Sequence, residues 1–130
     1  MAKTNSKEIR SMVTNDGNIE LSIKTSEIPT PLADEVIIKV EAAPINPSDL
    51  GLLLSFAADI SSISTTGSGD EAKTTIKIHP ALIGAMKPRL DQSMQVGNEG
   101  AGVVIDAGEN VKNLIGKTVG LAGGAMYSQY

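Results

Sequence analysis

The chain has 130 residues, of which 41% are hydrophobic and 20% charged, and its formal net charge at pH 7 is −4. A globular chain of this length buries roughly two thirds of its unfolded surface, so we expect one domain with one core. The sequence contains no cysteine and a single histidine. This excludes disulfide frameworks, thiolate zinc sites, a cysteine nucleophile and a multi-histidine metal site within the chain.

Charge and hydropathy also bound the cellular setting. The chain is mildly acidic and has no basic stripe, which argues against nucleic acid as a partner. No stretch approaches the roughly 20 apolar residues of a membrane span. Residues 1–10 are polar with no apolar run behind them, so no signal peptide is expected. We therefore expect a cytoplasmic protein that contacts neither membrane nor nucleic acid.

The first 40 residues predict three strands. We expect residues 9–14 to be extended, residues 15–18 to form a turn with Gly17 at positive φ, and residues 19–24 to complete a hairpin. Apolar and polar side chains alternate over residues 19–24, which is the period of a strand with one buried face. Residues 36–40 are apolar at all positions but one, which predicts a strand buried on both faces.

A short helix is expected after this strand. Asn46 suits the N-cap position, Pro47 suits the first helical position, and Asp49 follows the cap by three residues. Apolar residues at helical spacing continue to Ala57, so we expect the helix to fade near Asp59.

The next segment has a different composition. Eight of the 15 residues in 61–75 are Ser or Thr, and the segment also contains Gly67, Gly69, Asp70 and Glu71. This composition is typical of a flexible loop or a partly disordered insertion.

The remainder of the chain predicts short strands and turns. Residues 74–78 are expected to be extended, and residues 80–86 to form one or two helical turns that Pro88 ends. A buried strand is expected at residues 103–105 and a turn at residues 107–110. Residues 114–121 are expected to form a turn and another strand, and residues 123–127 to start a further extended segment. The pattern alone therefore predicts a mainly-β, partly open barrel with one or two short helices.

Two glycine-containing motifs do not match nucleotide-binding loops. Gly116 to Thr118 lacks the earlier glycine of a phosphate-binding loop, because that position holds Val111. Residues 97–102 lack the middle glycine of a dinucleotide fingerprint, because that position holds Glu99, and they precede a strand rather than opening a helix. We interpret this run as backbone that turns and crowds its neighbours, where a Cβ would not fit.

Few side chains suggest catalysis. His79 is the single imidazole, and a boundary or surface role is favoured because no orienting group can be assigned to it. Glu99 lies in an apolar, glycine-rich run, so a cleft role and a structural role both stay open. Tyr127 and Tyr130 are interpreted as packing residues.

Several segments together resemble a known family. They are residues 36–40, 42–50, 96–104, 108–111, 116–119 and 123–130. In this order they resemble the N-terminal domain of the medium-chain dehydrogenase/reductases, and specifically the zinc-independent branch of NADPH:quinone oxidoreductases and enoyl-thioester reductases. The resemblance covers about two thirds of the chain. It implies a GroES-like, partly open β-barrel, in which residues 1–130 form a catalytic domain with a flexible insertion around residues 61–75.

The resemblance also implies roles for individual residues. Zinc-dependent relatives carry cysteine and histidine where this chain has Asn46 and Asn98, so no metal is expected. In the zinc-independent branch an asparagine at the position of Asn46 lies beside the nicotinamide end of NADPH. Asn98 and Glu99 would border the substrate cleft. Enoyl-thioester reductases carry a catalytic tyrosine where residues 52–56 have none, so quinone reduction is favoured and no catalytic residue is assigned.

The family binds NADPH mainly through a following dinucleotide-binding domain, which these 130 residues do not contain. We therefore expect the N-terminal fragment of a longer oxidoreductase, inactive alone, whose full enzyme transfers hydride to an electron-poor small molecule. A homodimer is kept as a hypothesis. The alternative is a stand-alone GroES-like binding or assembly module without redox activity. Residues 61–91 have no counterpart that we can assign, so the electron acceptor stays open.

Overall fold

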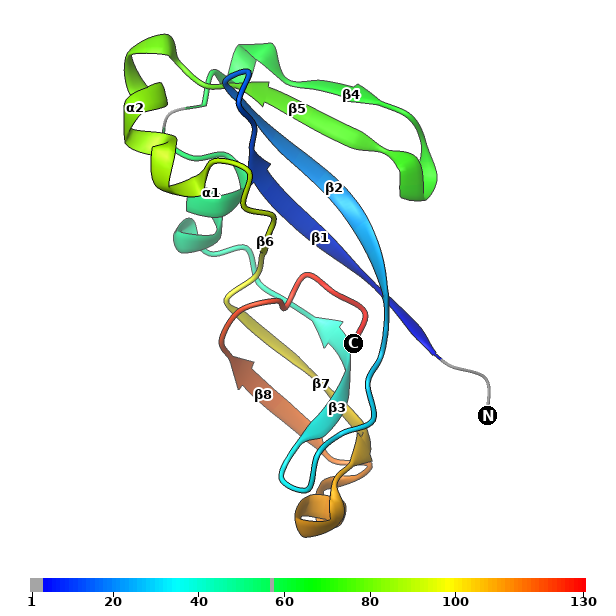
Figure 1. Ribbon diagram of the computed structural model, residues 1–130. Helices are drawn as coiled ribbons and strands as arrows, with labels where there is room; N and C mark the ends of the chain where they lie inside the picture. Colours follow the sequence, from blue (N-terminus) through cyan, green and yellow to red (C-terminus); the bar gives the residue numbers. More distant parts are fainter. Residues whose placement is uncertain (1–3, 57) are drawn as a thin grey trace. The chain divides into compact units, whose positions relative to one another are not determined.

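The computed structural model describes residues 4–56 and 58–130. These residues form two antiparallel sheets with short helices and no closed barrel, so the predicted mainly-β class is confirmed (Figure 1). Two compact units are made from interleaved segments. We call Ile9–Lys24 with Ile45–Val96 the helical unit, and the residues up to Glu8 with Thr25–Pro44 and Gly97–Tyr130 the three-stranded unit.

The larger sheet has the strand order β4-β5-β2-β1-β6. Its strands are β1 (Asn5–Val13), β2 (Asn18–Glu27), β4 (Ser64–Thr66), β5 (Lys73–Lys77) and β6 (Met94–Gln95). β1 and β2 form the predicted hairpin, and Gly17 in its turn has a φ of +80°. Most of this sheet belongs to the helical unit, and the unit boundaries fall within β1 and β2.

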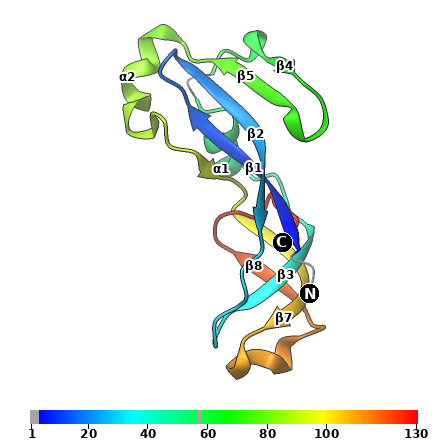
Figure 2. The same ribbon diagram turned by 45° about the vertical axis from the view of Figure 1, so that its right-hand side comes forward.

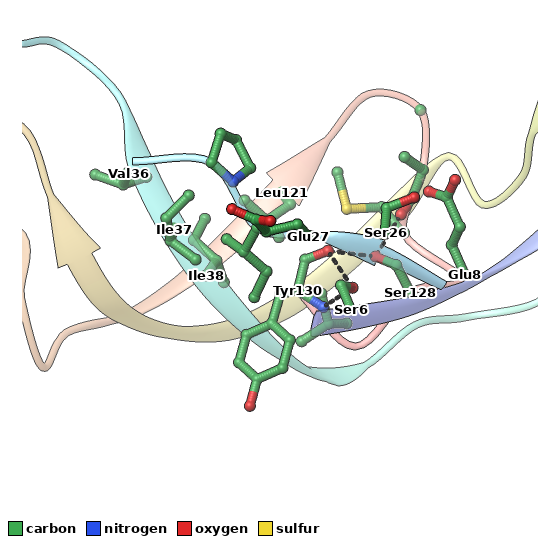
Figure 3. Close-up of a pocket in the computed structure, with 16 residues that line it drawn as sticks. Ser6, Glu8, Ser26, Glu27, Val36, Ile37, Ile38, Leu121, Ser128 and Tyr130 are labelled. Atoms are coloured by element: carbon green, nitrogen blue, oxygen red, sulfur yellow. Dashed lines mark hydrogen bonds between the residues drawn. The ribbon is translucent and has the colours of Figure 1, made fainter. Parts of the chain in front are cut away.

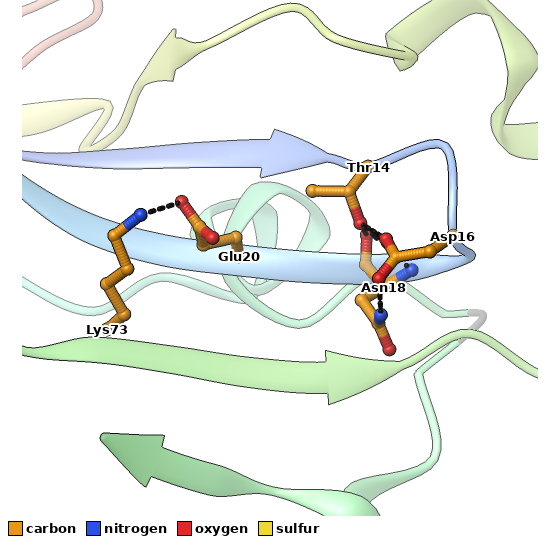
Figure 4. Close-up of polar contacts among 5 residues, drawn as sticks. All are labelled: Thr14, Asp16, Asn18, Glu20 and Lys73. Carbon is orange, nitrogen blue, oxygen red and sulfur yellow. Dashed lines mark hydrogen bonds and ion pairs between the residues drawn. The ribbon is translucent and has the colours of Figure 1, made fainter.

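Polar side chains stabilise the β1–β2 turn. Thr14 Oγ1 donates to one carboxylate oxygen of Asp16, and Asn18 Nδ2 donates to the other at 2.9 Å (Figure 4). The Thr14 hydroxyl, together with the Asp16 backbone and the Asn18 amide, lowers the pKa of Asp16. Further along β2, Lys73 Nζ of β5 pairs with Glu20 at 3.3 Å. The turn is thus fixed by local hydrogen bonds to an ionised carboxylate.

The core of the helical unit lies under this sheet. Five buried side chains form one cluster, contributed by both strands and helices: Val13, Ile19, Ile76, Ile78 and Met86. Ile19 of β2 lies opposite Ile76 of β5 in the antiparallel pairing. The alternation of apolar and polar residues in β2 therefore correctly indicates which side chains face the core. Burying each such side chain stabilises the fold by roughly 1.5–3 kcal/mol.

The helices of this unit are short. They are α1 (Pro47–Leu53), α2 (Ile83–Met86) and the 3₁₀ turns η1 (Ile60–Ser62), η2 (Gly69–Glu71), η3 (Pro80–Leu82) and η4 (Lys87–Arg89). The predicted start of α1 at Pro47 is confirmed. Its predicted length is wrong, because Ser55 at a φ of +60° turns the chain out of the helix two residues after its end. Ala57 lies outside the described residues. α2 ends at Met86, and Pro88 belongs to η4 rather than ending the helix directly.

The segment predicted to be a loop contains regular structure instead. β4 pairs with β5, and β5 pairs with β2, so residues 61–75 carry one arm of a hairpin and most of the second. The Thr65 and Thr74 hydroxyls meet across it at 2.9 Å. Threonine is polar but β-branched, and it suits an exposed strand once a neighbouring strand provides a ladder.

The three-stranded unit contains the second sheet, in the order β3-β7-β8 (Figure 2). Its elements are β3 (Val36–Ala42), β7 (Glu99–Ala107), the 3₁₀ segment η5 (Glu109–Leu114) and β8 (Thr118–Ala122). The prediction that β3 is buried on both faces is wrong. Lys39 is exposed and the apolar residues at positions 36, 37, 38 and 40 are only half-buried, because β3 is an edge strand of this sheet.

Two further expectations about this unit need correction. Val104 of β7 is buried, but its neighbour Ile105 is 44% exposed, so the expected buried strand at residues 103–105 is only partly buried. Residues 123–127 form no strand. Ala125 has a φ of +75°, and the ladder is limited to one bridge between Ser128 and Glu8. A left-handed residue interrupts the extended conformation that a strand requires.

Candidate cofactor and substrate site

Asn46 caps the N-terminus of α1 in the helical unit, as predicted. Its φ of −87° and ψ of 156° are extended, and Pro47 follows as the first helical residue. The Asp49 carboxylate accepts a hydrogen bond from the Asn46 backbone N–H at 2.8 Å, which is the return half of a capping box. Asp49 is fully buried. Asn46 is half-buried. Its backbone is therefore held by Asp49 while part of the residue remains accessible to solvent.

Asn98 and Glu99 lie at the start of β7 in the three-stranded unit. The Asn98 carbonyl accepts from the Gly123 N–H at 2.8 Å, and Glu99 pairs with Ala122 of β8. Glu99 is exposed. It borders a shallow depression of about 440 Å³, whose other lining residues are mostly small: Ala42, Pro44, Gly100, Ala101, Gly120, Leu121 and Ala122. The structure thus groups Asn98 and Glu99 together, and it describes Asn46 within the other unit.

The glycine-rich run is explained by close backbone contacts. Gly97 has a φ of +94°, and a Cβ there would lie 2.6 Å from the Tyr127 nitrogen. A Cβ on Gly102 would lie 2.1 Å from the Lys39 carbonyl oxygen of β3. The interpretation of this run as crowded, turning backbone is therefore confirmed. Glycine is needed here for packing.

Tyr127 connects the C-terminal segment to the end of β3. Its hydroxyl donates to the Pro44 carbonyl at 2.9 Å, and the Met126 N–H donates to the Gly97 carbonyl at 3.1 Å. The same segment crowds Gly97. The packing role predicted for Tyr127 is therefore confirmed, and its contacts hold the loop that faces the start of β7.

His79 is exposed and caps a 3₁₀ turn. Its Nδ1 accepts from the Ala81 N–H at 3.3 Å. The predicted boundary or surface position of this imidazole is confirmed. Its charge is among the smaller influences that lower the pKa of Asp59, after the hydrogen bonds from Ser61.

Sequence reasoning missed an apolar cavity of about 330 Å³ in the three-stranded unit (Figure 3). It is lined by Val36, Ile38, Leu121 and other side chains from β1, the end of β2, β3, β8 and the C-terminal segment. Ser6 and Ser128 converge on the backbone of Tyr130, with the Ser128 hydroxyl 2.9 Å from its carbonyl. The half-buried apolar residues of β3 were the available signal, but they were interpreted as core.

Sequence reasoning also missed Arg89 of η4. Nη1 of Arg89 donates to the Gly51 carbonyl at 3.3 Å, and Nη2 donates to Ser11 Oγ at 3.0 Å and to the Leu52 carbonyl at 3.4 Å. Burial lowers the pKa of this guanidinium. Its Nε is buried without a hydrogen-bond acceptor among the described residues. A donor left in this state costs about 1–3 kcal/mol.

Within residues 4–56 and 58–130, no three histidine, cysteine, aspartate or glutamate side chains are grouped as a metal centre requires. No helix in this part of the chain has both the length and the hydropathy to cross a membrane. No protein-family model matches the chain, and no curated protein sequence matches it.

Proposed function

We propose that the chain is the substrate and catalytic domain of a zinc-independent, NADPH-dependent oxidoreductase of the quinone-reductase type, acting in the cytoplasm. The observation that carries the proposal is the environment of Asn46. The buried Asp49 carboxylate accepts a hydrogen bond from the backbone N–H of Asn46. Asn46 is itself half-buried, at the end of the connection that leads from β3 into α1. A neutral amide held in this way can donate and accept hydrogen bonds without adding charge. That chemistry suits the uncharged carboxamide of a reduced nicotinamide.

The chain's own contribution is binding and orientation. When bound, NADPH supplies the hydride, and the acceptor takes that hydride together with a proton. Asn46 would orient the nicotinamide ring. Asn98 and Glu99 would border the acceptor, and the small residues beside Glu99 leave room for a flat ring. In this proposal most of the contacts to NADPH belong to a dinucleotide-binding domain outside these 130 residues, and the partner is a small, electron-poor molecule.

A titration of the ¹⁵N-labelled chain with NADPH tests the assignment of residues. We expect weak binding, in the millimolar range typical of a partial site, with the largest shifts at the Asn46 side-chain amide and at the Asn98 and Glu99 backbone amides. Asn46→Ala should abolish the response. Asn110→Ala is the matched control, because the side-chain amide of Asn110 donates to Asp34 at 2.8 Å and Asn110 has no role in the proposed site. Shifts confined to other residues, or none at all, would overturn the assignment.

The gene downstream of the Tyr130 codon provides a second test. A reading frame that continues into a strand, a glycine-rich turn and a helix would supply the dinucleotide-binding domain. The longer protein should then oxidise NADPH with a quinone, and residues 1–130 alone should not. Oxidation of NADPH by residues 1–130 alone would contradict the proposed division of labour.

One observation favours the alternative of a binding or assembly module. Three apolar side chains of the helical unit are exposed close together in sequence: Phe56 by 78%, Ile60 by 54% and Ile63 by 46%. Exposed apolar groups of this kind mark association surfaces. Sedimentation analysis distinguishes the two functions. A defined oligomer larger than a dimer that Phe56→Ser dissociates would favour the module, and a monomer or a dimer would favour the oxidoreductase domain.

A further inference from the structure

Helix α1 is held at its C-terminal end by a side chain from a distant part of the chain. Arg89 lies in η4, more than thirty residues after α1, yet its guanidinium bonds the carbonyls of Gly51 and Leu52. Ser11 of β1 joins the same group, since its hydroxyl accepts from Arg89 at 3.0 Å and donates to the Leu52 carbonyl at 2.5 Å. Ser11 is fully buried. Figure 1 shows that β1, α1 and the turn after α2 meet here.

These contacts provide the hydrogen-bond donors and the positive charge that the C-terminal end of α1 lacks in its own sequence. The helix has seven residues and no basic residue in its last turn. A helix of this length is not stable alone, and its last carbonyls have no partners within it. A cation at this end also complements the helix dipole. Asp49 holds the opposite end through the Asn46 N–H. The helix is therefore fixed between a buried carboxylate and a half-buried guanidinium.

We propose that Arg89 is a positioning residue for Asn46: by fixing α1 against β1 it sets the place of the Asn46 amide. The functional meaning of this inference rests on the proposed role of Asn46 beside the nicotinamide. All three acceptors of Arg89 are uncharged, and its Nε has no acceptor among the described residues. An arginine with these contacts is a poor means of adding stability, but its planar fork fixes three groups in one geometry.

The proposal also gives a role to the segment that the family resemblance left unexplained. Arg89 lies near the end of residues 61–91, and this segment packs into the same unit through Ile76, Ile78 and Met86. Its hairpin and turns thus bring the guanidinium to α1.

Amide hydrogen exchange in the 130-residue chain, followed by NMR, tests the proposal. In Arg89→Gln we expect the Asn46 and Asp49 amide hydrogens to exchange about tenfold faster or more, which is the effect of losing one hydrogen bond to a charged group. The amides of Ile19 and Ile76 should be unchanged. Lys87→Gln is the matched control, because Lys87 lies in the same turn and is exposed.

Chemical rescue tests whether the guanidinium group itself, rather than the bulk of the side chain, protects the Asn46 and Asp49 amides. Methylguanidinium added to Arg89→Ala should restore slow exchange at Asn46 and Asp49, whereas methylammonium should not. Arg89→Lys, which keeps the charge and loses the fork, serves as the second variant if Arg89→Gln and Arg89→Ala fail to fold, and it should show faster exchange at the same two amides.

Two results would overturn the proposal. One is unchanged exchange at Asn46 and Asp49 in a folded Arg89 variant. The other is an equal increase at Ile19 and Ile76, which would mean that Arg89 supports the whole unit. NADPH takes no part in these measurements. Failure here is therefore distinct from failure of the proposed function, which the NADPH titration of Asn46→Ala detects.

Discussion

The helical unit and the three-stranded unit are stabilised by different kinds of contact. The helical unit packs a cluster of five buried apolar side chains. Among the described residues of the three-stranded unit, the buried apolar side chains are Val104 and Ala107 alone. That unit relies instead on glycines that let backbones approach, at Gly102 against Lys39 and at Gly108 against Leu32. We therefore expect the helical unit to be destabilised by smaller core side chains, and the three-stranded unit by side-chain atoms added at its glycines.

Removing volume from the helical unit should have the largest effect. Ile19 is fully buried and faces Ile76, so Ile19→Ala leaves a cavity and should lower the free energy of unfolding by about 4 kcal/mol. Ile23 is the control on the same strand, since it is 37% exposed and Ile23→Ala should cost about 1 kcal/mol. Urea unfolding measures both. Equal losses at the two positions would contradict a core located at this end of β2.

Adding volume to the three-stranded unit should come next. Gly102→Ala places a Cβ 2.1 Å from the Lys39 carbonyl oxygen, so β3 and β7 must separate, at about 3 kcal/mol. Gly120→Ala is the control in the neighbouring strand, where nothing lies within 4 Å of the added atom. Thermal unfolding with exchange at β3 amides is the measurement. A neutral Gly102→Ala would show that backbone approach does not hold this sheet.

Relieving backbone strain should stabilise the three-stranded unit slightly. Ala125 has a φ of +75°, which favours glycine, so Ala125→Gly should raise the free energy of unfolding by about 0.5–1 kcal/mol. Ala122→Gly, in the extended β8, should lower it by a similar amount. Differential scanning calorimetry resolves the two signs. A loss of stability in Ala125→Gly would argue against strain at this residue.

The smallest effect is pH-dependent and belongs to the helical unit. The pKa of Asp16 is lowered in the folded state, chiefly by the Thr14 hydroxyl, so its ionised form stabilises the turn above the unfolded pKa of 3.8. Asp16→Asn should lower the melting temperature between pH 5 and 7. The difference from the unchanged chain should shrink as the pH falls below 3.8 and vanish below the lowered pKa of the folded state. Asp70→Asn is the control at another exposed carboxylate. A difference that is undiminished at pH 2 would contradict the assignment.

Local patterns predicted most of the strands and the start of α1. The alternation in β2, the glycine in its turn and the Asn46, Pro47 and Asp49 spacing each act within a few residues, so no distant contact was needed. The mistakes arose where a neighbour from elsewhere in the chain decided the outcome. Residues 61–75 became a hairpin because β2 offered an edge to β5. β3 was expected to be core because its apolar run does not reveal that it is an edge strand.

In the candidate site, too, the features set by local sequence were predicted and those set by distant contacts were not. Asn46, Asn98 and Glu99 were named from motifs, and the glycines around them were correctly interpreted as crowded backbone. Neither the apolar cavity nor Arg89 was found, because each depends on segments that are distant in the sequence and are brought together by the fold. Composition and local spacing specify which residues turn, cap and alternate, since those preferences act through the nearest few peptide units. Which strand lies at an edge and which guanidinium meets which helix end depend on long-range packing, for which a single local pattern carries no signal.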